Sequence, residues 1–146
     1  MADPLEGRAP YILDTSAILA YLAGESGSER LATHHRNSAI PFMALSELYY
    51  VIWQKKGKAA ADGAVALVKA WKLPLLLPDE RVILMAGRLK AMYRLGIADS
   101  YMAAFALDRA GTLVTKDPDF QALRTEIKIL ALEEQPPHSP RRRIPS

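Results

Sequence analysis

Short apolar runs alternate with longer helical patterns along most of the chain. Five runs have the length and flanking residues of buried strands: Tyr11–Leu13, Ala39–Pro41, Leu75–Leu77, Thr112–Thr115 and Lys128–Leu130. The segments between them have helical patterns, at Thr15–Leu22, residues 42–57, Lys58–Trp71, Arg81–Tyr93 and Ala98–Ala110. Strands that alternate with helices form parallel sheets covered on both faces, so the pattern predicts an α/β fold with a central parallel sheet.

Several residues at the predicted helix ends support this assignment. Lys55 and Lys56 precede Gly57, where positive charge suits the negative end of a helix dipole. Asp79 stands where it can cap the helix over Arg81–Tyr93. Gly111 follows the last predicted helix, and we expect it to close that helix.

The ends of the chain differ in composition from its centre. Residues 1–9 and the Pro- and Arg-rich residues 133–146 contain few apolar side chains, so we expect a flexible leader, one domain over residues 10–132 and a disordered tail. The net charge is +3, and Arg141–Arg143 alone can account for it, so the pI of about 9.2 is only weak support for a nucleic-acid partner.

Cysteine is absent from the chain, which excludes disulfides and thiolate metal sites and is consistent with a reducing compartment. The N-terminus lacks the apolar core of a secretory signal. No apolar run reaches the roughly 18 residues that a membrane span needs. We therefore expect a cytoplasmic protein.

Asp14 stands between two apolar segments, directly after the first predicted strand. A carboxylate there either caps the next helix or binds a metal ion at the carboxyl edge of the sheet, where parallel sheets bind ligands. Asp117 follows the strand Thr112–Thr115 by two residues, so we expect both acids at the same edge. Asp117 precedes Pro118 and can itself cap a helix, and Asp119 is either a ligand or a helix-start acid.

Glu47 and Asp99 lie in predicted helices whose other side chains are largely apolar. Glu47 points away from the apolar stripe of its helix, yet its neighbours at helical spacing are also apolar. An ionised carboxylate in such surroundings is costly unless it is paired or bound to a metal. The alternatives are that Glu47 reaches water on a half-covered face, and that Asp99 only interacts with the dipole at its helix start.

These acids come from four separate segments that the fold would bring to one edge of the sheet. Two like charges about 4 Å apart repel by roughly 4 kcal/mol at an effective dielectric of about 20, so such a cluster needs protons or a cation. Carboxylates without a cysteine or histidine partner favour Mg²⁺ or Mn²⁺. Because Mg²⁺ retains water ligands and engages phosphates, the cluster indicates phosphodiester chemistry.

Four motifs in order, LDTSAILAYL, ALSELYYVI, LGIADSYMAAFAL and LVTKDPDF, resemble those of PIN-domain ribonucleases, and most closely the VapC-type toxins of toxin–antitoxin pairs. The resemblance covers nearly all of residues 10–130 and implies a three-layer PIN-like fold with a parallel sheet of four to five strands. It implies catalytic and metal-binding roles for four acids, Asp14, Glu47, Asp99 and Asp117. Asp119 would be an additional metal ligand, and the hydroxyls of Thr15, Ser16 and Thr115 would support the site.

The resemblance also implies a function and partners. The function is that of an endoribonuclease dependent on Mg²⁺ or Mn²⁺, in which an activated water cleaves RNA and leaves a 5′-phosphate. The partners are the RNA substrate, a VapB-like antitoxin whose arginine enters the acidic groove, and a second copy of the chain in a homodimer.

Other interpretations remain open. A phosphotransfer receiver or a haloacid-type phosphatase also has an aspartate after a strand, although Ser16 stands where the phosphatase has a second aspartate. A non-enzymatic PIN-like module would use the acidic groove to bind a basic peptide. Lys55, Lys56 and Lys58 either contact an RNA backbone or form a solvated helix end.

Overall fold

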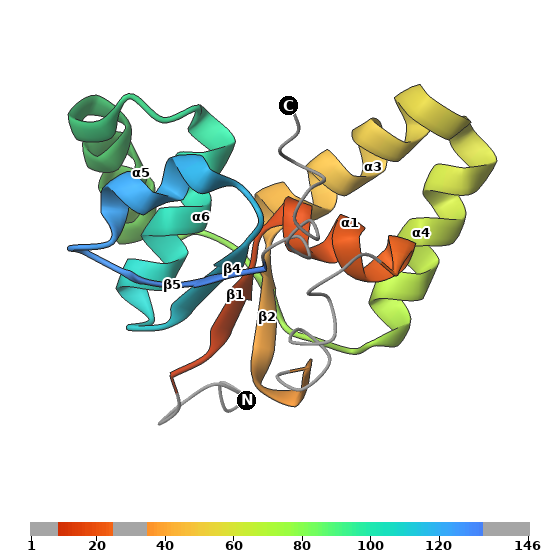
Figure 1. The fold of residues 1–146 in the computed structure, drawn as a ribbon, viewed down its shortest axis with the longest axis horizontal. Coiled ribbons are helices and arrows are strands. Elements are labelled where there is room, and N and C mark those ends of the chain that lie inside the picture. Colours follow the sequence, from red (N-terminus) through yellow and green to blue (C-terminus); the bar gives the residue numbers. More distant parts are fainter. Residues whose placement is uncertain (1–8, 25–34, 133–146) are drawn as a thin grey trace, which may run out of the picture.

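The computed structural model describes residues 9–24 and 35–132, and its ribbon is shown in Figure 1. The predicted leader, apart from residue 9, and the predicted tail lie outside the described residues. The strands are β1 (Tyr11–Leu13), β2 (Ser38–Pro41), β3 (Leu75–Leu76), β4 (Thr112–Thr115) and β5 (Lys128–Ala131). The predictions of β1 and β4 are confirmed to the residue, and the other three strands differ from their predicted bounds by one residue.

The five strands form one sheet in the order β3-β2-β1-β4-β5, and every neighbouring pair is parallel. β1 lies at the centre, with Tyr11 opposite Ser38 of β2 and Thr112 of β4. The chain moves outward from β1 to β2 and β3, then returns to the other side of β1 with β4. The carboxyl ends of β1 and β4 therefore form the switch point of the sheet, where ligands bind in folds of this kind.

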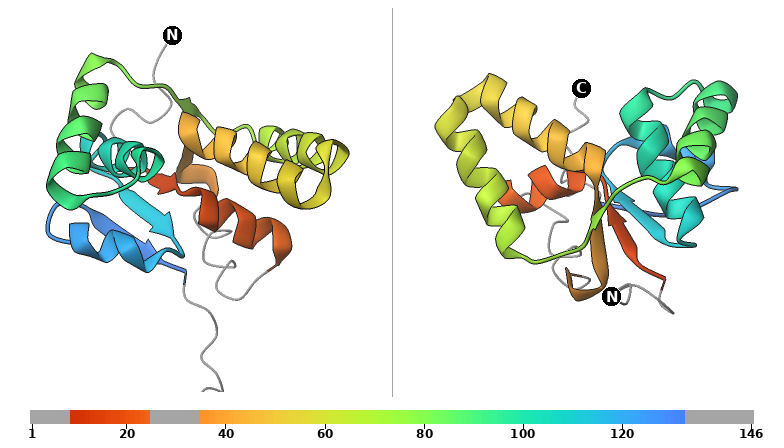
Figure 2. Two further views of the ribbon diagram at one scale, coloured as in Figure 1. Left: turned by 90° about the horizontal axis from the view of Figure 1, so that it is seen from above. Right: turned by 180° about the vertical axis from the view of Figure 1, so that it is seen from behind.

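The helices are α1 (Thr15–Ala23), α3 (Phe42–Lys56), α4 (Lys58–Ala70), α5 (Glu80–Tyr93) and α6 (Ile97–Asp108), with 3-10 helices η1 (His35–Asn37) and η2 (Pro118–Leu123). Figures 1 and 2 show α1, α3 and α4 on one side of the sheet and α5 and α6 on the other. The prediction of a three-layer α/β fold is confirmed. None of the helices in the described residues has both the length and the apolar character needed to cross a bilayer.

The core lies where α6 packs against the central strands. Ile12 and Leu13 of β1 and Met102, Ala103 and Phe105 of α6 are almost completely buried. The alanines of α6 let its backbone approach β1 and β4 closely, and this packing fixes the start of α6 against the centre of the sheet.

The end of α6 corrects the prediction that this helix runs to Ala110 and is closed by Gly111. The helix ends at Asp108, and Ala110 adopts the left-handed conformation with φ of 50°. Gly111 N–H donates to the Ala106 carbonyl, which completes a Schellman motif. The pattern failed here because alanine occupies the position that usually carries glycine. Gly111 is needed for another reason, since a Cβ at this position would lie 2.5 Å from the Pro10 carbonyl oxygen.

At the start of α5, Asp79 accepts a hydrogen bond from the backbone N–H of Val82 at 3.0 Å, so the predicted cap is confirmed.

Candidate active site

Asp14 follows β1 directly and occupies the N-cap position of α1, yet its side chain makes no capping hydrogen bond. The carboxylate is instead turned into the protein, and the residue is only 4% exposed. Its Oδ2 accepts hydrogen bonds from Ser16 Oγ at 2.8 Å and from Thr115 Oγ1 at 2.7 Å. Helix capping therefore does not account for this buried acid.

The same two hydroxyls connect Asp14 to the chain that follows β4. Ser16 Oγ accepts the backbone N–H of Lys116 at 2.9 Å, and Thr115 Oγ1 accepts that of Asp117 at 2.9 Å. Each hydroxyl thus donates its hydrogen to Asp14 and accepts a hydrogen bond from the backbone that follows β4. The two strand ends at the switch point are held together through this carboxylate. The Lys116 and Asp117 N–H groups could not be anticipated, because a backbone donor has no sequence signature.

Glu47 reaches the same region from α3, where its side chain is partly buried. Its Oε1 accepts a hydrogen bond of 2.6 Å from Thr15 Oγ1, and Thr15 is buried at the start of α1. The face of α3 that carries Glu47 is thus partly covered, and the carboxylate has one hydrogen-bond partner from α1. A charge-assisted bond of this length compensates part of the cost of burial.

Asp99 lies in the first turn of α6, after the N-cap residue Gly96. Ser100 Oγ donates to the Gly96 carbonyl at 2.9 Å, which fixes the start of the helix. The pKa of Asp99 is raised from 3.8 to about 6, first by burial and then by the negative charges of four other acids: Asp14, Asp117, Glu47 and Asp119. The carboxylates from all four segments therefore interact electrostatically at one place.

Asp117 and Asp119 belong to the segment after β4. Asp117 is the N-cap of η2, and its Oδ1 accepts the Asp119 N–H at 2.9 Å. Pro118 occupies the first position of η2, as proline does at helix starts. Asp117 is partly buried and Asp119 is exposed. The helix-start explanation thus holds for Asp117, but its charge still acts on Asp99.

Asp14 experiences opposing influences on its ionisation. Burial raises its pKa, the hydrogen bonds from Thr115 and Ser16 lower it, and the nearby charge of Asp117 raises it again. The net direction is upward. In the folded protein the ionised forms of Asp14 and Asp99 are therefore both disfavoured. A bound cation would stabilise both ionised forms.

The donor chemistry of the cluster fits Mg²⁺ or Mn²⁺, because every acid offers hard carboxylate oxygens. Within residues 9–24 and 35–132, however, no three acidic or histidine side chains stand in an arrangement that could hold an ion as they are placed. Hydroxyls already occupy one oxygen of Asp14 and one of Glu47. Metal binding by these acids remains a prediction.

The basic residues predicted as a possible RNA contact lie where α3 meets α4. Lys55 and Lys56 are exposed in the last turn of α3. Lys58 Nζ forms an ion pair with Asp62 at 2.8 Å on an exposed face of α4. Lys58 therefore has a structural partner within its own helix.

The comparison with protein families matches residues 11–126 to the PIN domain. The chain belongs to the PIN domain family. PIN domains are generally nucleases, and this membership decides against a receiver or a haloacid-type phosphatase. A comparison with curated proteins found no match.

Solved structures share the fold of this PIN domain. VapBC2 from Rickettsia felis, bound to a promoter DNA fragment, matches with a TM-score of 0.69 at 19% identity over 83% of this chain and 97% of the other. DNA-bound VapBC from Salmonella typhimurium matches with a TM-score of 0.68 at 21% identity over 85% and 98%. VapBC-5 from Mycobacterium tuberculosis, from a family of toxin–antitoxin systems, matches with a TM-score of 0.64 at 23% identity over 86% and 98%.

Proposed function

We propose that this PIN domain is a metal-dependent endoribonuclease that acts as the toxin of a toxin–antitoxin pair. One observation carries the proposal: at the switch point of the sheet, Asp99 lies within reach of carboxylates from three other segments, whose charges add to burial in raising its pKa to about 6. Such a concentration of negative charge costs stability and is expected where function requires it. The likeness to VapBC structures supports a toxin rather than another nuclease.

Each side chain of the candidate site would have a role set by where it lies. Asp14, Glu47, Asp99 and Asp117, with Asp119 at the exposed side, would hold one or two Mg²⁺ or Mn²⁺ ions. A bound ion would supply an activated water and neutralise charge on the phosphoryl oxygens. Ser16 and Thr115 would keep Asp14 fixed, and Thr15 would keep Glu47 fixed, so that little reorganisation is needed when RNA binds.

Asp14→Asn should abolish metal-dependent RNA cleavage and leave the fold intact, because the amide keeps the size of the side chain but not its charge. The assay incubates purified protein with RNA and Mn²⁺ and analyses the ends of the fragments, which should carry 5′-phosphates. Circular dichroism verifies the fold of the variant. Glu80→Gln, at an exposed acid in the first turn of α5, is the matched control and should cleave like the wild type.

Cleavage by Asp14→Asn at the wild-type rate would refute the assignment of the site. Mn²⁺ binding by the wild type without any RNA cleavage would instead favour a PIN-like binding module.

The antitoxin would be a VapB-like protein that covers an apolar groove on the helices that follow β1 and β2. Such a groove of about 520 Å³ lies between α1, α3 and α4, is lined by side chains such as Leu19, Ile52 and Leu67, and has Lys55 and Lys56 at its rim. An arginine of the antitoxin could pair with the carboxylates of the site. The product of the gene immediately upstream should inhibit RNA cleavage in a one-to-one complex, and an upstream product that neither binds nor inhibits would count against the toxin assignment.

The chain would also form a homodimer. Leu77, Leu84 and Ile97 are 70%, 66% and 50% exposed, and all three lie in or beside α5 and the start of α6. Exposed apolar side chains in such number suit a protein interface. Sedimentation should give twice the 16.1 kDa of one chain, whereas a monomer at high concentration would exclude the dimer.

A further inference from the structure

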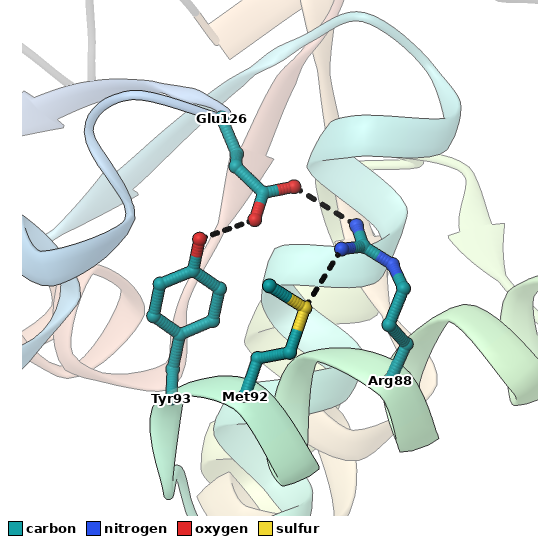
Figure 3. A network of polar contacts seen from close by, with 4 residues as sticks. All are labelled: Arg88, Met92, Tyr93 and Glu126. Atoms are coloured by element: carbon teal, nitrogen blue, oxygen red, sulfur yellow. Dashed lines mark hydrogen bonds and ion pairs between the residues drawn. The ribbon is translucent and has the colours of Figure 1, made fainter.

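A polar network links α5 to the segment between η2 and β5 (Figure 3). Glu126 Oε1 accepts a hydrogen bond from Arg88 Nη2 at 2.9 Å, and its Oε2 accepts one from the hydroxyl of Tyr93. The other terminal nitrogen of Arg88 contacts Met92 Sδ at 3.1 Å. The side chain of Glu126 is 21% exposed, and the bonds from Arg88 and Tyr93 lower its pKa. Each carboxylate oxygen of Glu126 thus has its own donor on α5.

One end of this network leads to Asp99 along a short, well-fixed stretch of chain. Tyr93 is the last residue of α5, and Asp99 follows six residues later. Arg94 closes α5 in the left-handed conformation with φ of 58°, and its N–H donates to the Lys90 carbonyl. Lys90 Nζ donates to the carbonyl of the buried Leu95 at 2.9 Å. The connection from Tyr93 to Asp99 is thus short and is held by hydrogen bonds within α5 and to Leu95.

The other end leads to Asp117 and Asp119. Glu126 N–H donates to the Leu123 carbonyl at 2.8 Å, and Leu123 and Phe120 of η2 are completely buried. Asp119 is joined to Asp117 by the capping hydrogen bond of η2. The segment from Asp117 to Glu126 is thus internally fixed, so a tether at its end restrains its beginning.

We propose that Glu126 is a positioning residue for the acidic cluster, holding the segment that carries Asp117 and Asp119 against the segment that carries Asp99. Charge gives such a tether a role, because these acids repel one another and the tether adds to the packing and hydrogen bonds that oppose this repulsion. The role rests on the proposed function only in that its effect is measured through the binding of a divalent cation by these acids. Groups that hydrogen-bond directly to metal ligands change metal affinity by about 10- to 100-fold when removed, so an indirect tether should act at the lower end of that range.

The test compares Glu126→Ala and Glu126→Gln with a matched control, Asp108→Ala. Asp108 pairs with Arg81 of α5 at 2.5 Å, but it is the last residue of α6 and lies about 13 Å along the helix from Asp99. The control therefore removes an ion pair to α5 without affecting the tether. Calorimetric titration with Mn²⁺ alone should show about 10-fold weaker binding for Glu126→Ala, a smaller loss for Glu126→Gln, which keeps an acceptor, and wild-type binding for Asp108→Ala.

Two further readouts separate positioning from general loosening. RNA cleavage by Glu126→Ala should approach the wild-type rate at saturating Mn²⁺. In the metal-free protein, amide hydrogen exchange in residues 117–127 and 94–99 should accelerate for Glu126→Ala and not for Asp108→Ala. If Glu126→Ala does not fold, Tyr93→Phe removes one of the two bonds and should weaken Mn²⁺ binding by about 3-fold, as a partial form of the same effect.

Each outcome bears on a separate claim. Wild-type protein that binds no Mn²⁺ would end the proposed function, and hydrogen exchange would then decide on the tether by itself. Wild-type protein that binds Mn²⁺ while Glu126→Ala binds it equally well would overturn the positioning role. An equal loss in Asp108→Ala would overturn it too, because any ion pair to α5 would then have the same effect.

Discussion

Replacing Asp99 with asparagine should stabilise the metal-free protein at neutral pH. Burial and the charges of the neighbouring acids raise the pKa of Asp99 from 3.8 to about 6, so the folded protein carries this charge at a cost. Asparagine has nearly the same shape and no charge. The variant should therefore avoid the unfavourable ionisation of Asp99 and have a larger free energy of unfolding, although it loses a proposed metal ligand.

The magnitude follows from the size of the pKa shift. The rise in the pKa of Asp99 from 3.8 to about 6 corresponds to about 3 kcal/mol before screening by solvent. Asp99 is only partly buried, and solvent screening reduces this figure to about 1–2 kcal/mol. Asparagine also loses the favourable interaction of a carboxylate with the start of α6, about 0.5 kcal/mol. The expected net gain is about 1 kcal/mol at pH 7.5.

The gain should depend on pH in a defined direction. Because the folded protein binds the Asp99 proton more tightly than the unfolded chain does, the wild type loses stability as the pH rises from about 4 to above 6. Below the unfolded pKa both states are protonated and the cost is absent. The advantage of Asp99→Asn should therefore be full at pH 7.5 and much smaller at pH 4, close to the unfolded pKa of 3.8.

Urea denaturation with a chelator present, at pH 7.5 and pH 4, measures the free energy of unfolding of both proteins. Asp62→Asn is the control, because hydrogen bonds from Lys58 and Tyr49 lower the pKa of Asp62 and its removal should bring no gain at pH 7.5. The reasoning fails if Asp99→Asn is less stable than the wild type at pH 7.5, or if its advantage is the same at both pH values.

Two further predictions concern the fold around the site. Ala110→Gly should stabilise the protein by about 1 kcal/mol, because glycine adopts the left-handed conformation without strain. Gly111→Ala should destabilise the protein by about 2 kcal/mol, because the Cβ of the new alanine would clash with the Pro10 carbonyl oxygen. Urea midpoints test both changes, and equal effects of the two would contradict the assignment of the turn. Thr15→Val should cost about 1–2 kcal/mol by leaving Glu47 without its hydroxyl donor. In a double-mutant cycle with Glu47→Gln, a coupling energy of zero would show that the bond contributes nothing.

The layers and strands could be predicted well because the spacing of apolar residues along a segment depends directly on which of its side chains are buried. β1 and β4 agree with their predicted bounds, and Asp79 caps α5 as expected. The end of α6 was mispredicted because the turn places Ala110, and not a glycine, in the left-handed conformation. Such choices depend on tertiary contacts that a local pattern does not contain.

The candidate site was only partly accessible to the same reasoning. Asp14 and Asp117 could be expected at one edge of the sheet because each follows a strand, and Asp99 because it opens a helix, whereas Glu47 was singled out only by its apolar neighbours. Whether Asp14 caps α1 or turns inward could not be decided from its neighbours, because Thr115, its partner, is 101 positions away. The link from Glu126 to Arg88 spans 38 positions and has no local signature at all.

The central claim is that carboxylates from separate segments share one pocket and act on one another. An NMR titration of the Asp99 side-chain carboxyl in the metal-free protein tests it most directly. The account predicts a midpoint near pH 6 that falls toward 3.8 in Asp14→Asn. A wild-type midpoint near 3.8 that does not respond to removal of Asp14 would contradict the shared pocket.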